Sequence, residues 1–583
     1  MSSRMSGWIV AAMLLLPLGL SAESPSSDSN EAKHFRFSEA TVAELQAAMA
    51  SGSLSSEELT RAYIKRIFEL DQGGPGVNSV IELNPDALAM AQQADAWRRQ
   101  GRVLGPLHGI PVLLKANIDT GDKMQTTAGS FALQGRPALR DSTVAEKLRA
   151  GGAVILGKTN LSEWANFRSN SSISGWSGVG GQTHNPYGID RNPCGSSAGS
   201  GAAESANFTT VSLGTETDGS IVCPANANGV VGIKPTVGLT SRAGVVPISH
   251  TQDTVGPHGR TVADAAVALG VIQSVASDGR DPATGSVPLG WQGRSRPTNI
   301  PTDYTKFLNP TGLHGARIGV TRQGVDSAPP PVIAAFDAAV EAIKAAGATV
   351  IELDGDNGAG FTFPSPDGEL LVLEYDFRAD VQAYFATRVG VPMAGKTLAD
   401  TIAFNSAHAD VEMPFFGQDL FEQAEGLAQG ANAPQPDFNG MTYNQALEID
   451  RLSGVNGIDK ALQQFNLDAI VAPTDNPAWA TDLLYGDHFI FGSSSLAAAE
   501  GYPIVQVPAG AVFGIALGIS FFGTAFSEPT LIKLASGFEA ATHARAKNLP
   551  TFAPTIPDDH VAGTTLHWPH RKPGDKNSRP HHM

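Results

Sequence analysis

Apolar residues recur at every third or fourth position in three segments near the N-terminus, with polar residues between them. This spacing predicts amphipathic helices over residues 41–52, 55–71 and 84–101. Glu44 follows Thr41 by three residues, and Glu58 follows Ser55 by three, which is the spacing of a capping box at a helix start. Asn84 is the expected cap of the third helix.

Shorter apolar runs bounded by Gly and Pro predict buried strands between further helices. The run "GIPVLLKANI" at 109–118 is one such strand and ends at a lysine. Residues 142–160 are typical of a helix, a Gly turn and a strand, and the helix-then-strand order returns at 330–353 and 444–474. This alternation predicts an α/β fold.

Both ends of the chain depart from this pattern. Arg4, an apolar stretch at 8–20 and small residues before Ala22 predict a signal peptide over 1–22. A flexible polar segment is expected at 23–35 and a polar tail at 551–583. No later apolar run reaches membrane-spanning length, so we expect an exported protein, periplasmic or secreted.

Composition narrows the function classes. The 583 residues are 42% hydrophobic and 17% charged, which allows a large buried core. The net charge is −17, whereas nucleic-acid-binding proteins are typically basic, so this charge disfavours nucleic-acid binding. The two cysteines, Cys194 and Cys223, could form a disulfide in an oxidising compartment or be small buried residues.

Two Ser-Gly turns stand close together, "PCGSSAGSGAA" and "GTETDGSIVCPAN". In the first, "GSSAG" matches the G-x-S-x-G nucleophile elbow with Ser197 at its centre, but that motif needs a strand before it, and "NPYGIDRNPC" is typical of a loop. Lys115 ends the apolar run "PVLLK". A buried lysine there would have a lowered pKa and could act as a base; the alternative is a surface lysine with a buried stem.

Lys115 and both turns together resemble the amidase signature family. Further segments fit it, including "GPLHGIPVLLKANIDT", "LRAGGAVILGKTNLSEWA", "GVVGIKPTVGLTSRAGVVPIS" and "YPIVQVPAG", over roughly 36–270 and 465–545. The resemblance implies a large mixed β-sheet with helices on both faces. It also implies a single domain over 36–550 with a variable insertion at about 275–440, from which the substrate-binding residues are expected.

The family's Ser–cis-Ser–Lys triad falls on three residues of this chain. The resemblance makes Ser220 the nucleophile, Ser196 the bridging serine after a cis peptide bond, and Lys115 the base. Backbone N–H groups of Thr217, Asp218, Gly219 and Ser220 would form the oxyanion hole. No cofactor and no metal are expected.

The chain departs from the family pattern at Cys194 and Ala198, at Asp218 and at Val222. None of these removes a triad member. The Asp218 carboxylate could contact the substrate or cap the following helix.

"GTETDGSIVCPA", "CGSS" and "TNLSEWANFRSNSSISGWSGVGGQT" look most like the peptide amidase branch. This implies hydrolysis of a C-terminal peptide amide to an acid and ammonia. An amidase of aryl or fatty-acyl amides is one alternative, and a catalytically silent binding protein on the same fold is another. The signal peptide and acidic charge disfavour the transamidating enzyme that acts on charged tRNA. A metal hydrolase is disfavoured because no H-E-x-x-H motif is present.

Overall fold

A mixed sheet runs through the protein. The computed structural model describes residues 35–325, 328–355 and 358–555. In these residues eleven strands form one sheet, which in spatial order consists of β1 (Val80–Leu83), β3 (Val154–Thr159), β2 (Pro111–Lys115), β6 (Val211–Glu216), β8 (Thr254–Gly259), β7 (Val231–Lys234), β12 (Ile504–Val512), β13 (Ile515–Phe522), β11 (Ala469–Pro473), β9 (Arg317–Val320) and β10 (Thr349–Glu352).

Parallel and antiparallel pairs both occur in this sheet. β2 runs parallel to β3 and β6, and β9 runs parallel to β10 and β11. β6 is antiparallel to β8, and β12 is antiparallel to both β7 and β13. The expected α/β fold with a large mixed sheet is therefore confirmed.

Helices cover both faces of the sheet, as the alternation of side chains along its strands demonstrates. On β12 and β13, Val505 and Ile519 belong to a core that includes residues of the helices α8 (Val262–Ile272), α9 (Pro330–Ala345) and α17 (Glu528–Thr542). The neighbouring Ile504 and Phe522 belong to a second core that includes Val222 of α7 (Val222–Ala227). Both faces are apolar, so these strands appear in the sequence as continuous apolar runs.

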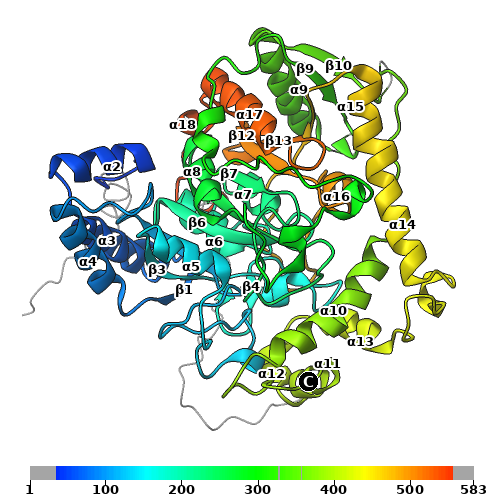
Figure 1. Ribbon diagram of the computed structural model, residues 1–583, viewed down its shortest axis with the longest axis horizontal. Coiled ribbons are helices and arrows are strands. Elements are labelled where there is room, and N and C mark those ends of the chain that lie inside the picture. Colours follow the sequence, from blue (N-terminus) through cyan, green and yellow to red (C-terminus); the bar gives the residue numbers. More distant parts are fainter. Residues whose placement is uncertain (1–34, 326–327, 356–357, 556–583) are drawn as a thin grey trace, which may run out of the picture. The chain divides into compact units, whose positions relative to one another are not determined.

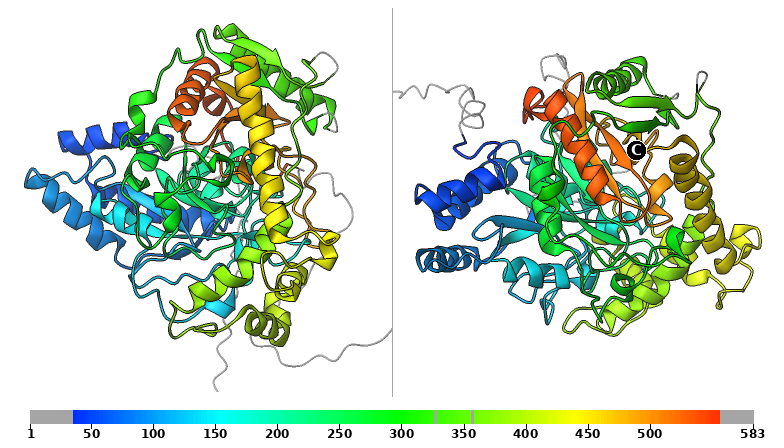
Figure 2. Two further views of the ribbon diagram at one scale, coloured as in Figure 1. Left: turned by 45° about the vertical axis from the view of Figure 1, so that its right-hand side comes forward. Right: turned by 45° about the horizontal axis from the view of Figure 1, so that its top comes forward.

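Figures 1 and 2 show α14 (Tyr443–Gly454) and α15 (Lys460–Phe465), in yellow, as one long helical column that is continuous through residues 455–459. The α-helices are α2 (Val42–Ser51), α3 (Ser56–Arg66), α4 (Ala87–Arg99), α5 (Thr143–Ala150), α6 (Ala198–Ser205), α7 (Val222–Ala227), α8 (Val262–Ile272), α9 (Pro330–Ala345), α10 (Glu369–Phe385), α11 (Leu398–Ala407), α12 (Ala409–Glu412), α13 (Asp419–Gly426), α14 (Tyr443–Gly454), α15 (Lys460–Phe465), α16 (Ser495–Ala498), α17 (Glu528–Thr542) and α18 (Ala544–Lys547).

The N-terminal caps follow the sequence prediction closely. Both predicted capping boxes form, at Thr41 for α2 and at Ser55 for α3. The third helix differs from the prediction. α4 begins at Ala87, and the Asn84 side chain accepts a hydrogen bond from the N–H of Asp86, which precedes the helix. Asn84 therefore closes a turn ahead of the helix rather than capping it.

The segment at 275–440 has two parts. β9 and β10 extend the main sheet and α9 packs against it, while α10, α11 and α13 pack with Trp164 and Phe167 in a core of their own. The described residues from Glu39 onward belong to one compact unit. The predicted signal peptide lies outside the described residues. No described helix is long and apolar enough to cross a membrane.

Candidate active site

Sheet topology brings the predicted residues to one edge. Lys115 is the last residue of β2, and Ser220 lies in the turn between β6 and α7. Because β2 and β6 are parallel neighbours, their C-terminal ends meet at the same edge of the sheet. Ser196 approaches from the loop before α6.

Lys115 is completely buried. Its Nζ donates to Ser196 Oγ at 2.7 Å, to Thr215 Oγ1 at 2.9 Å and to the Thr215 carbonyl at 3.2 Å. Burial lowers the pKa of Lys115 to about 7, although the negative charges of Asp253 and Glu216 oppose this shift. The side chain can therefore exist as a neutral amine near pH 7.

Ser196 follows a cis peptide bond from Gly195. Its side chain is fully buried, and its carbonyl accepts the Ser162 N–H at 3.0 Å. A Cβ on Gly195 would collide with Ser162 Oγ, so this position requires glycine. These contacts hold Ser196 Oγ against Lys115.

Ser220 lies on the wall of a cavity of about 520 Å³, with 7% of its surface exposed. The Ser220 carbonyl accepts the Ser197 N–H at 3.1 Å, which joins the two serine turns. The Ser197 hydroxyl is engaged elsewhere, because it donates to the Thr215 carbonyl at 3.0 Å. The loop before Ser197 contains no strand, which agrees with rejecting the nucleophile-elbow interpretation.

Glu216 holds the turn around Ser220, a role that the sequence motifs did not indicate. Its carboxylate accepts the N–H groups of Gly219 at 2.9 Å, Ile221 at 2.7 Å and Val222 at 3.0 Å. The Gly219 N–H, one of the predicted oxyanion donors, thus already has an acceptor. An acidic residue just before a helix start was the available signal, since carboxylates favour helix N-termini.

Asp218 does not cap the following helix. The N–H groups at the start of α7 go to Glu216, whereas Asp218 Oδ2 accepts from Ser495 Oγ. Its other oxygen, Oδ1, is buried with no hydrogen-bond partner in the described structure. Asp218 also lines the cavity with Ser220.

The nucleophile turn contacts further polar groups behind it. Thr217 Oγ1 donates to Asp253 Oδ1 at 2.6 Å, and burial raises the pKa of Asp253 to about 6. His258 Nε2 contacts the Ile221 carbonyl at 3.0 Å, and burial lowers the pKa of His258 to about 4. His258 is therefore neutral at pH 7, and its Nε2 is engaged by a carbonyl.

The cavity lining corrects one expectation. Of the described residues that line it, only Leu373 comes from the 275–440 segment. The others come mainly from 165–174, from the two serine turns and from 475–495. The physical reason is that the chain after β11 is bonded to the nucleophile turn and to α7: Ser495 Oγ donates to Asp218 Oδ2, and Asn226 Nδ2 donates to the Asn476 carbonyl at 3.2 Å.

A disulfide between Cys194 and Cys223 links the two serine turns. Cys194 lies two residues before Ser196, and Cys223 lies three residues after Ser220. Both cysteines also line the cavity. The bond that the sequence left open is therefore formed, and it covalently connects the two parts of the site.

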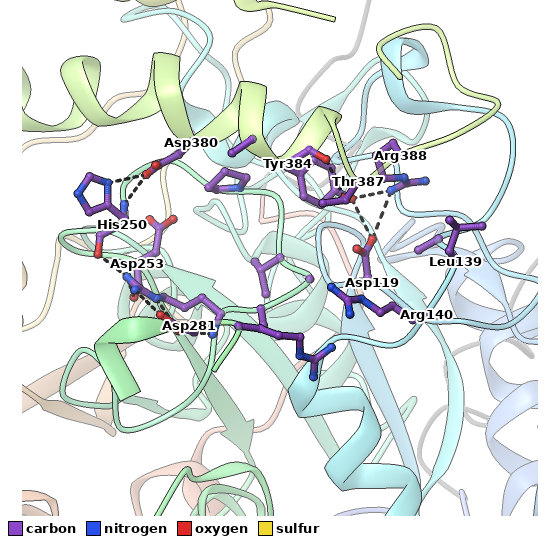
Figure 3. Close-up of a pocket in the computed structure, with 18 of the residues that line it drawn as sticks. Asp119, Leu139, Arg140, His250, Asp253, Asp281, Asp380, Tyr384, Thr387 and Arg388 are labelled. Atoms are coloured by element: carbon purple, nitrogen blue, oxygen red, sulfur yellow. Dashed lines mark hydrogen bonds and ion pairs between the residues drawn. The ribbon is translucent and has the colours of Figure 1, made fainter. Parts of the chain in front are cut away.

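A second cavity, of about 610 Å³, shares no lining residue with the cavity that contains Ser220 and is drawn in Figure 3. Its acidic side chains are already paired: Asp380 with His250 at 2.9 Å, and Asp119 with Arg388 at 3.3 Å. Asp253 belongs to this lining and accepts a hydrogen bond from Thr217, which lines the cavity that contains Ser220, here called the catalytic cavity. It therefore connects the two cavities electrostatically.

Among the described residues, His250, Asp376 and Asp380 have side chains close enough to share a metal ion. The Asp376 carboxylate already accepts hydrogen bonds from three hydroxyl groups, those of Ser249, Thr251 and Tyr443. These bonds account for the carboxylate, and we assign no metal to the cluster.

The mixed sheet and the buried lysine–serine pair beside a cavity define an α/β fold with a candidate serine–lysine hydrolytic site. The Amidase family model matches residues 58–532, and the chain belongs to this family. It is thus an amide-hydrolysing enzyme, as the resemblance implied.

Similar proteins agree on this class. The chain is 47% identical to the native peptide amidase from Stenotrophomonas maltophilia, with a TM-score of 0.78, over 89% of this chain and 99% of that one. It is 40% identical over 542 residues to a probable amidase of Arabidopsis thaliana, covering 92% and 95% of the two chains. It is 33% identical to an amidase family protein from Bacillus anthracis, with a TM-score of 0.74, over 91% of this chain and 95% of that one.

Proposed function

We propose that this protein is an exported serine amidase that hydrolyses the C-terminal carboxamide of peptides to an acid and ammonia. The observation that carries the proposal is the 2.7 Å hydrogen bond between buried Lys115 and Ser196, together with the position of Ser220 on the cavity wall. Ser220 is the nucleophile, Ser196 the bridging group and Lys115 the base.

In the first step, neutral Lys115 takes the proton of Ser196 while Ser196 takes the proton of Ser220. Ser220 Oγ forms a bond to the amide carbon, and the carbonyl electron pair moves to oxygen. The C–N bond then breaks as the same proton returns through Ser196 to the leaving nitrogen, which departs as ammonia. Water cleaves the acyl-Ser220 ester by the reverse relay and gives the acid.

The developing oxyanion requires N–H donors, each worth about 2.7–4 kcal/mol in related catalysis. Of the predicted set, Thr217, Asp218 and Ser220 retain this role in the proposal. Gly219 contributes its conformation, because its φ of +77° is left-handed and its N–H is held by Glu216.

Two findings support a peptide amide as the substrate. A peptide amidase 47% identical to this chain, with a TM-score of 0.79, is known in complex with the competitive inhibitor chymostatin. The catalytic cavity of about 520 Å³ is large enough for an aminoacyl amide.

Export rests on the sequence of residues 1–22. The Cys194–Cys223 disulfide supports it, since disulfides persist mainly in oxidising compartments. Fractionation of cells that express the full chain tests it: the expected result is a periplasmic or secreted form that begins near residue 23, and an uncleaved cytoplasmic form would overturn it.

The activity is tested by ammonia release from C-terminal peptide amides, aryl amides, fatty amides and glutamine, with Ser220→Ala beside the wild type. We expect release from peptide amides and a loss of about 10⁴-fold or more in the variant. Activity on aryl or fatty amides alone would remove the peptide assignment and keep the nucleophile. Activity that survives Ser220→Ala would remove the nucleophile assignment.

A further inference from the structure

Two aspartates on the wall of the catalytic cavity have oxygens without a hydrogen-bond partner in the described structure. Asp475, which follows β11, is 3% exposed, and its Oδ2 is buried and unpaired. Asp218 Oδ1 is also buried and has no partner in hydrogen-bond geometry, although the Ser494 hydroxyl lies near this carboxylate. Leaving such an acceptor unpaired costs about 1–3 kcal/mol, so a donor supplied by the substrate would be favourable.

The ionisable side chains that line the described part of this cavity are all acidic, apart from the phenol of Tyr485 and the bonded cysteines: Asp218, Asp475 and Asp487. Burial raises the pKa of Asp475 well above its usual range, and the nearby charges of Asp218 and Glu216 raise it further. A cation that entered the cavity would relieve this repulsion, whereas an anion would add to it.

Aromatic side chains stand at the same wall. Tyr485 is 81% exposed and Phe489 is 52% exposed, although both line the cavity. Trp479 also lines it and donates its indole N–H to Asp487 at 3.3 Å. Aromatic faces attract cations and pack against aliphatic stems, so this wall suits a positively charged group on an apolar arm.

We propose that Asp218 and Asp475 form a subsite that binds a positively charged nitrogen on the acyl part of the amide substrate and disfavours acyl groups that carry a carboxylate. This inference rests on the proposed function and names its substrate class. It also bears on the product, because the acid released by hydrolysis is an anion. The same subsite would weaken product binding.

The test measures kcat/KM for four amides of similar size. Acetyl-norleucine amide is the neutral reference, acetyl-lysine amide adds a side-chain cation, norleucine amide carries an α-ammonium, and acetyl-glutamate amide carries an anion. We expect at least one cationic amide to exceed the reference about tenfold and the anionic amide to fall about tenfold below it. The better cationic amide shows which ammonium the subsite binds.

Variants locate the effect. Asp475→Asn and Asp218→Asn should each reduce the ratio of the preferred cationic amide to acetyl-norleucine amide about fivefold or more. Asp487→Asn is the matched control, because it removes one negative charge from the same cavity while its oxygens already accept from Ser174, Asn192 and Trp479. Its effect on the ratio should be smaller. Equal effects of all three variants, or an unchanged ratio in Asp475→Asn, would overturn the subsite.

Failure of this inference can be distinguished from failure of the proposed function. If the wild type hydrolyses acetyl-norleucine amide and Ser220→Ala does not, the proposed function is supported, whatever the ratio of kcat/KM between the cationic and neutral amides. Titration calorimetry on Ser220→Ala measures binding without turnover, and acetyl-lysine amide or norleucine amide should bind about tenfold more tightly than acetyl-glutamate amide. Equal binding of all these ligands would overturn the subsite even in an active enzyme.

Discussion

Lys115 Nζ lies 2.7 Å from Ser196 Oγ, and both side chains are inaccessible to solvent. Burial lowers the pKa of Lys115 to about 7, so the lysine changes protonation state in the neutral range. The Lys115 amine can therefore act as the base for a serine nucleophile in place of histidine, because it is buried away from water. Two properties of the enzyme depend on that burial.

The first is the pH dependence of activity. Only the neutral lysine can accept a proton, so kcat/KM for acetyl-norleucine amide should be level above pH about 7 and fall about tenfold per unit below it. Lys115→Arg keeps its charge at all these pH values and should lose about 10³-fold or more. A wild-type profile without a limb between about pH 6 and 8 would contradict Lys115 as the base.

The second concerns Asp253, whose negative charge favours the protonated form of Lys115. Asp253→Asn removes that charge, so the pKa of Lys115 should fall and the acid limb should move to lower pH. Asp380→Asn is the control, because Asp380 lines the second cavity with Asp253 and pairs with His250 (Figure 3). A limb that moves upward in Asp253→Asn, or equally in both variants, would argue against the electrostatic link.

Glu216 gives a third prediction. In Glu216→Gln the amide group cannot accept the three N–H groups of Gly219, Ile221 and Val222 that the carboxylate accepts. We expect the free energy of unfolding to fall by about 1–3 kcal/mol and kcat to fall while KM changes little. Urea unfolding and steady-state kinetics measure the two effects. Glu341→Gln is the control, because Glu341 is an exposed residue of α9. A change in KM alone would show that the turn is held by other contacts.

The Cys194–Cys223 disulfide closes a loop with a sequence separation of 29. A loop of that length constrains the unfolded chain by about 3–4 kcal/mol. The Cys194→Ala/Cys223→Ala double variant should therefore have a lower Tm than the oxidised wild type, and reductant should lower the Tm of the wild type alone. Equal sensitivity of both proteins to reductant would contradict this assignment.

Glu500 gives a prediction for stability against pH. It is buried, and burial raises its pKa to about 8, so it is protonated in the folded protein where the unfolded chain is ionised. The unfolded state then binds fewer protons than the folded state. The free energy of unfolding therefore falls progressively as the pH rises from about 4.5 to about 8. Glu500→Gln should stabilise the protein by at least about 1 kcal/mol at pH 9 and by less at pH 5. Equal effects at both pH values would contradict the shift.

Local features of the fold were predictable from the sequence. Residues close together in the sequence determine the capping boxes at Thr41 and Ser55 and the strand that ends at Lys115. The resemblance also placed Ser196 beside Lys115, because the motif carries a geometry that spacing alone does not. Asn84 was misplaced because a turn ahead of α4 used the side chain first.

Long-range features were not predictable in the same way. Asp475 reaches the cavity only because β11 lies beside β9 and β13, an order that no local pattern encodes. The substrate-binding residues were expected from 275–440, because that segment is where the family varies in sequence. The structure instead places residues 475–495 in the lining of the catalytic cavity. Glu216 was missed because its role is to bind backbone N–H groups rather than to react.

The pairing of β7 with β12 joins Lys234 to Ile504, about 270 residues apart in the chain. All three triad residues have been synthesised by residue 220, long before their supporting strands exist. During translation the growing chain therefore carries an incomplete sheet with an open edge, a state exposed to aggregation. Activity should arrive only when residues 504–522 have joined, so a fragment that ends before β12 would contain the catalytic residues without being an enzyme.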